Sequence, residues 1–119
     1  MTTLSERPYY YILRDGVPVP VSCEEWGSWF ETANRVIERT TLEDGTVIST
    51  AFLGLDHAFG LQGEPVLYET LVFGSELDGE MERYITLAEA RRGHAEMVQK
   101  VKYAQQSKRR RNRRNTKTA

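Results

Sequence analysis

The residues that could carry out chemistry are few, and the two histidines come first. His57 follows Asp56 in a glycine-containing segment, whereas His94 lies in a helical pattern near the C-terminus. Imidazoles and carboxylates that a fold brings together can bind a divalent cation or transfer protons. The candidate pocket combines two aromatic side chains with these histidines and two carboxylates: Phe52, Asp56, His57, Glu69, Tyr84 and His94. Such a pocket would suit a small ligand such as a nucleotide.

The spacing of these candidates in the sequence matches no motif that would place two metal ligands on one helix or loop. The chain has no His-x-Glu, His-x-x-x-His or Cys-x-x-Cys element, and Cys23 is its only cysteine, so we expect no metal and no cofactor. His94 shares the apolar face of its helix, which favours a hydrogen-bonded core histidine with Glu69 as a possible partner. His57 is expected to cap its own loop together with Asp56. Because no nucleophile elbow or phosphate loop is present, we expect no catalytic residues, and an enzyme is disfavoured.

The charge of the C-terminal segment is the strongest signal in the sequence. Residues 100–119 contain nine Lys and Arg and no Asp or Glu, whereas residues 1–99 contain seven Lys and Arg against seventeen Asp and Glu. Like charges packed this closely need an anionic partner or solvent. The residues expected to contact nucleic-acid phosphates are Lys108, Arg109, Arg110, Arg111, Arg113, Arg114 and Lys117. Two other interpretations stay open: a disordered solubilising arm, or a segment that lies on the acidic body.

Length and composition indicate one domain. The chain has 119 residues, of which 39% are hydrophobic, which suffices for a single core. We predict an α+β domain over residues 1–106 and a basic, flexible tail over residues 107–119. No stretch approaches the roughly 20 apolar residues of a membrane span, and the first eight residues lack the apolar run of a secretory signal, so we expect an intracellular protein.

Two Asp-Gly pairs predict hairpins in the first half of the chain. Asp15-Gly16 lies between apolar runs, and a two-residue turn there pairs Arg14 with Val17. In this register Pro18 and Pro20 occupy positions whose backbone N–H would not bond to the partner strand. The second hairpin, over residues 35–53, is expected to pair Leu42 with Val47 and Ile37 with Phe52.

Capping signals predict two helices. Ser22 and Glu25 form a capping box that opens a short helix with Trp26, Trp29 and Phe30 on one side, a stripe typical of a core. Thr86 and Glu89 form another, which opens a helix with apolar residues every three or four positions. We expect this helix to fray near residues 105–108, because consecutive arginines repel.

The order of the elements predicts an α+β fold. Strands are expected at residues 66–74 and 82–85 in addition to the two hairpins. Runs of strands closed by one terminal helix favour an antiparallel sheet of about five strands, with the long C-terminal helix packed on one face and the short Trp-rich helix at one end of the core.

Three blocks of sequence resemble a small uncharacterised protein family of bacteriophages and prophages. The blocks are ISTAFLGLDHAFG (48–60), LYETLVFG (67–74) and ERYITLAEARRGHAEMV (82–98). The chain departs from the family at residues 61–64 and in its arginine tail. The resemblance implies a virus-associated origin and the cytoplasm of a bacterial host, without implying an activity.

These observations favour a phage-type, non-enzymatic accessory protein that acts by binding. Its partner would be a host protein or protein–nucleic-acid complex, such as a defence or nucleic-acid-processing machine that it inhibits. The tail would contact nucleic acid, and we expect no membrane partner. One alternative is a nucleotide sponge or weak enzyme that uses the His/Asp/Glu pocket. Another is a structural component of the virion or of DNA packaging.

Overall fold

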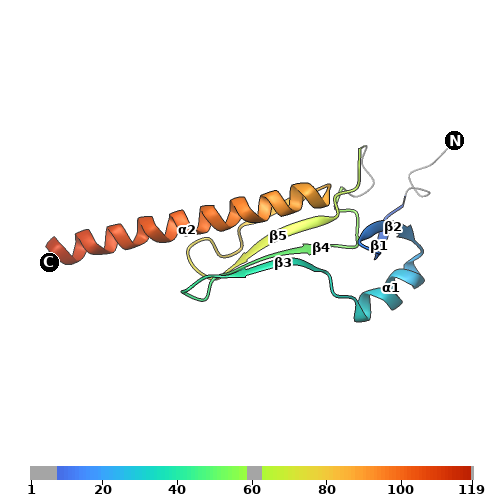
Figure 1. The fold of residues 1–119 in the computed structure, drawn as a ribbon, viewed down its shortest axis with the longest axis horizontal. Coiled ribbons are helices and arrows are strands. Elements are labelled where there is room, and N and C mark those ends of the chain that lie inside the picture. The colour runs from blue at the N-terminus through green and yellow to red at the C-terminus, as the bar shows by residue number, and fades with distance from the viewer. Residues whose placement is uncertain (1–7, 59–62, 119) are drawn as a thin grey trace.

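The computed structural model describes residues 8–58 and 63–118, which form an α+β fold of six antiparallel strands and two helices (Figure 1). The elements are β1 (Tyr10–Arg14), β2 (Val17–Val21), α1 (Cys23–Thr32), β3 (Val36–Thr41), β4 (Val47–Phe52), β5 (Tyr68–Phe73), β6 (Met81–Tyr84) and α2 (Leu87–Thr118). The strands form two sheets, a β1-β2 ribbon and a four-stranded sheet in the order β3-β4-β5-β6. The predicted class is confirmed, with the strands divided between two sheets.

The first hairpin has the predicted register. Arg14 pairs with Val17, and each proline of β2 lies opposite a residue of β1. Asp15 and Gly16 have φ values of 52° and 78°, which is the conformation of a two-residue type I′ turn. An isolated bridge between Tyr10 and Leu55 joins this ribbon to the segment that follows β4.

The second hairpin is one residue out of the predicted register. Thr41, not Leu42, pairs with Val47, because Leu42 accepts from Gly45 and donates to Thr46 in a longer turn. Gly45 has a φ of 90°, and the Asp44 carboxylate accepts from the Thr46 N–H at 3.0 Å. A further irregularity between Val36 and Glu38 shifts the pairing again, so the expected match of Ile37 with Phe52 is also wrong.

Helix α1 begins as predicted and lies at one end of the main sheet (Figure 1). The Ser22 hydroxyl accepts from the Glu25 N–H at 3.2 Å. No residue of α1 is fully buried. Trp29 meets Phe52 edge to face at 5.9 Å between ring centroids, so the aromatic stripe covers the end of the core.

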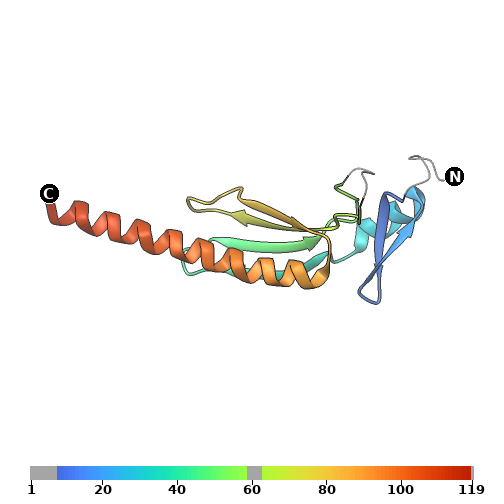
Figure 2. The ribbon, with the colours of Figure 1, turned by 90° about the horizontal axis from the view of Figure 1, so that it is seen from above.

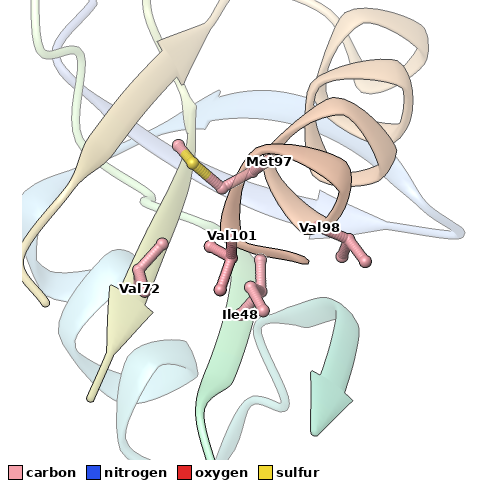
Figure 3. Close-up of a cluster of buried hydrophobic side chains, with 5 residues drawn as sticks. All are labelled: Ile48, Val72, Met97, Val98 and Val101. Carbon is pink, nitrogen blue, oxygen red and sulfur yellow. The ribbon is translucent and has the colours of Figure 1, made fainter. Parts of the chain in front are cut away.

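Helix α2 packs along one face of the four-stranded sheet. The Thr86 and Glu89 capping box is confirmed, since each side chain bonds the other residue's backbone N–H. Figure 3 shows the cluster below the helix, in which Met97, Val98 and Val101 meet Ile48 of β4 and Val72 of β5. Burial of these apolar side chains holds the two layers together.

The expected end of α2 near residues 105–108 is wrong, because the helix continues to Thr118 (Figure 2). Arg, Lys and Gln all have high helix propensity, and cations near a helix C-terminus are favoured by the helix dipole. The extended helix gives the molecule a longest dimension of 69 Å. None of the helices in the described part of the chain is long and apolar enough to span a bilayer.

Candidate functional site

His94 is a core residue, and hydroxyl groups surround its ring. Its Nε2 lies 2.8 Å from the Thr40 hydroxyl and its Nδ1 lies 2.7 Å from the Thr50 hydroxyl, which is 2.5 Å from that of Thr70. The side chain is 1% exposed. Burial lowers the pKa of His94, and Glu38, 3.6 Å away, opposes that shift only in part.

Tyr84 is the last residue of β6. Its ring lies against Gly93 of α2, where an added Cβ would overlap the phenol. Its hydroxyl is buried without a well-formed hydrogen bond to any described residue, and burial raises the pKa of this phenol despite the nearby Thr70. The contact explains why glycine occupies the interior of a helix at residue 93.

The other pocket candidates point to different places. Asp56 is buried and accepts from the N–H groups of Ala58 and Val66 at 2.8 and 3.0 Å, which is a turn-stabilising role. His57 donates from Nδ1 to the Leu55 carbonyl at 2.9 Å. Residues 59–62 of the glycine-containing segment lie outside the described residues.

Glu69 is not the partner of His94. It pairs with Arg83 at 3.0 Å on the opposite face of the sheet, because neighbouring strand residues alternate between faces and Thr70 takes the inward position. Phe52 is fully buried between Trp29 and Tyr68. The structure thus groups His94 with threonines and does not bring the six candidates into one pocket.

Residues 8–58 and 63–118 contain no cluster of three or more His, Cys, Asp or Glu side chains suited to a metal ion. Cys23 is exposed at the start of α1 and is a free thiol.

Two acidic loops hold the middle of α2. The turn between β3 and β4 supplies Asp44, which accepts from the Gln105 amide at 2.6 Å. The connection between β5 and β6 supplies Glu80, which pairs with Lys100, and Glu76, which pairs with Arg111 at 3.2 Å. Gln105 and Arg111 lie beyond the last buried apolar residue, Val101, so their contacts hold α2 to the body past the end of the apolar cluster.

We call residues 108–118 of α2 the basic arm, and it projects beyond the sheet (Figure 1). Val101 is buried and Lys108 lines a hollow beside Asp44 and Glu76, so these two residues mark the side of the helix that faces the body. At about 100° per residue, Arg110, Arg113 and Arg114 lie on the far side.

The far side of the arm is exposed and cationic. All side chains from residue 108 to residue 116 are exposed, and the side chain of Lys117 lies outside the described residues. Tyr103, which is 71% exposed, lies on the same side of α2, two turns before Arg110. Sequence reasoning missed Tyr103, because an aromatic residue in a helical pattern is normally assigned to the core.

No protein-family model matches this chain, and no curated protein or solved structure is significantly similar to it. The interpretation of the site therefore depends on its geometry and charge.

Proposed function

We propose that this protein is a non-enzymatic binding protein that holds nucleic acid through the basic arm. The observation that carries the proposal is the set of three arginines, Arg110, Arg113 and Arg114, exposed on the side of a projecting helix that faces away from the acidic body. Guanidinium groups bind phosphate oxygens in a bidentate manner. Arg111 pairs with Glu76 and therefore lies nearer the body than these three arginines do.

The shape of the arm suits a duplex. An α-helix with its side chains is about 10–12 Å wide, and the major groove of B-DNA is about 12 Å wide. Acidic residues in the loops beside α2 repel a phosphate backbone, which directs the nucleic acid to the projecting part of the helix. Arg and Asn side chains on phosphates carry little sequence information, so binding should be largely independent of sequence.

The test measures how binding to a labelled duplex depends on salt. Replacing Arg110, Arg113 and Arg114 with Ala should weaken binding and reduce the slope of log K against log salt by about 2.7, since each phosphate contact contributes about 0.9. The control replaces two other exposed arginines, Arg91 and Arg92, at the other end of the same helix. Equal loss in both variants, or none in the first, would contradict the proposal.

A variant at Tyr103 distinguishes binding to single-stranded nucleic acid from binding to a duplex. An exposed ring beside cationic residues can stack on an unpaired base, a contact worth about 1–3 kcal/mol. If Tyr103→Ala weakens binding to a single strand and spares the duplex, stacking contributes and the preferred ligand contains unpaired bases. If Tyr103→Ala binds both the single strand and the duplex as tightly as the parent chain does, binding depends on phosphate contacts alone.

The resemblance to phage proteins that we infer from three blocks of the sequence, and that no comparison has tested, suggests a biological setting for this activity. In the cytoplasm of a bacterial host, the arm would hold nucleic acid while the acidic body engages a host protein complex, such as a defence or nucleic-acid-processing machine that the protein inhibits. The supporting result is a specific partner captured from bacterial lysate both with and without nuclease treatment. Capture of nucleic acid alone would leave the binding activity and remove the antagonist role.

A further inference from the structure

The four-stranded sheet has a second face that α2 does not cover. Ile48, Thr50 and Phe52 of β4 are buried on the α2 side, so the residues between them point the other way. No other described element packs on that side (Figure 1). We call it the outer face.

The outer face has apolar residues on all four strands, interspersed with Arg39, Thr41, Ser49, Glu69 and Arg83. Val47 pairs with Phe73, Leu71 with Met81 and Val36 with Ala51, so each apolar residue has an apolar neighbour on the adjacent strand. Val36, Phe73 and Met81 are 47%, 50% and 45% exposed. Val47, Phe73, Leu71 and Met81 adjoin one another, and an exposed apolar group of this kind is a candidate interaction site.

The charged residues on the outer face favour a second copy of the chain over a basic protein as the partner. Residues 1–99 contain seventeen Asp and Glu, but the strand register places only Glu69 on this face, and it pairs with Arg83. Arg39 is the other charged residue there. Two copies of the chain can therefore approach through this face without the repulsion that the acidic body produces elsewhere. A basic protein partner would find almost no carboxylates here.

The size of the face is sufficient only for a small interface with a second copy. Strands lie about 4.8 Å apart and rise about 3.3 Å per residue, so four strands of up to six residues present a footprint of roughly 400 Å². Two such faces cover roughly 800 Å² before the relief of the side chains is counted, which is less than the approximately 1,000 Å² that a stable specific interface clears. The dimer expected from this area is weak and concentration-dependent.

We propose that two copies of this chain dimerise through the outer face. A two-fold axis parallel to the strands sets β4 against β5 of the partner subunit, so that Val47 faces Phe73 of the partner subunit. An axis across the strands would bring the two copies of Arg39 together. The favoured arrangement leaves both α2 helices on the outside with their basic arms pointing the same way.

Sedimentation equilibrium of the full chain without nucleic acid tests the dimer. Phe73→Glu and Met81→Glu place two carboxylates in a symmetric interface and should raise the dimer dissociation constant more than about tenfold. Val17→Glu is the matched control, because Val17 is an exposed valine on β2, outside the four-stranded sheet. Circular dichroism confirms that each variant is folded.

The proposal predicts self-association of the parent chain and of Val17→Glu, and its loss in both sheet variants. A parent chain that stays monomeric up to about 1 mM overturns the proposal and leaves the face for a different protein. A dimer that both sheet variants preserve also overturns it, since the contact would then lie elsewhere. The chain without residues 107–119 should still dimerise, so this test is independent of nucleic-acid binding.

Discussion

His94 shows how a buried histidine can stabilise a fold only while it is neutral. Both ring nitrogens have threonine hydroxyls as partners, and these can serve the neutral ring as donor or acceptor. Protonation would place a charge in the core with only the half-exposed Glu38 carboxylate nearby. The same burial that makes His94 unsuited to an open catalytic pocket makes the stability of the protein dependent on pH.

We expect the free energy of unfolding to fall as the pH drops below about 6.5, the pKa of an unfolded histidine. The folded-state pKa of His94 lies below that value, so the unfolded chain binds the proton more readily, and the stability present above pH 6.5 is lost as the pH approaches the folded pKa. Urea titrations across this range should show a smaller pH dependence in His94→Gln. His57→Gln, which removes the only other histidine, is the control.

Gly93 provides a second test at the residue scale. Because a Cβ there would overlap the Tyr84 ring, Gly93→Ala should lower the free energy of unfolding by about 1–3 kcal/mol despite the better helix propensity of Ala. Gly27 is the matched control, since it lies in α1 with no atom near the site of an added Cβ. Gly27→Ala should stabilise the protein by about 0.5–1 kcal/mol. Thermal or urea unfolding of both variants measures the difference, and a stabilising Gly93→Ala would contradict the packing argument.

At the scale of elements, local sequence signals predict the structure correctly where residues close in sequence determine it. The Asp15-Gly16 turn and the caps at Ser22 and Thr86 depend on residues close in sequence, and all three have the predicted form. The second Asp-Gly pair failed as a guide to register, because Asp44 bonds the Thr46 N–H and lengthens the turn. A one-residue difference of this kind arises from turn geometry that the residue types alone do not determine.

Contacts distant in sequence could not be predicted from local patterns. The partners of His94 come from β3 and β4, more than 40 residues before it. The continuation of α2 likewise depends in part on loops, since Asp44 and Glu76 hold Gln105 and Arg111. The nucleic-acid candidates were found from charge alone, but which arginines face outward follows only from the direction of the helix. The outer face depends on the sheet register and was not predicted.

At the scale of the whole molecule, the folded body and the basic arm should be separable in stability. Deleting residues 107–119 removes the Arg111–Glu76 pair, an exposed contact worth about 0–1 kcal/mol, and leaves every buried residue of the apolar cluster in place. We expect the unfolding midpoint in urea to change little, while the far-ultraviolet helix signal falls and duplex binding is lost. A truncated chain that unfolds would show that the arm belongs to the core.

The unbroken course of α2 has a mechanical consequence. One hydrogen-bonded ladder runs from the Thr86 cap past His94 to the tip of the helix, so the tip has no joint about which to swivel. A fluorophore attached at Asn112 should therefore reorient at the tumbling rate of the entire particle, with little fast local motion. A ligand bound at this end of the helix would then be held at a defined angle to the sheet.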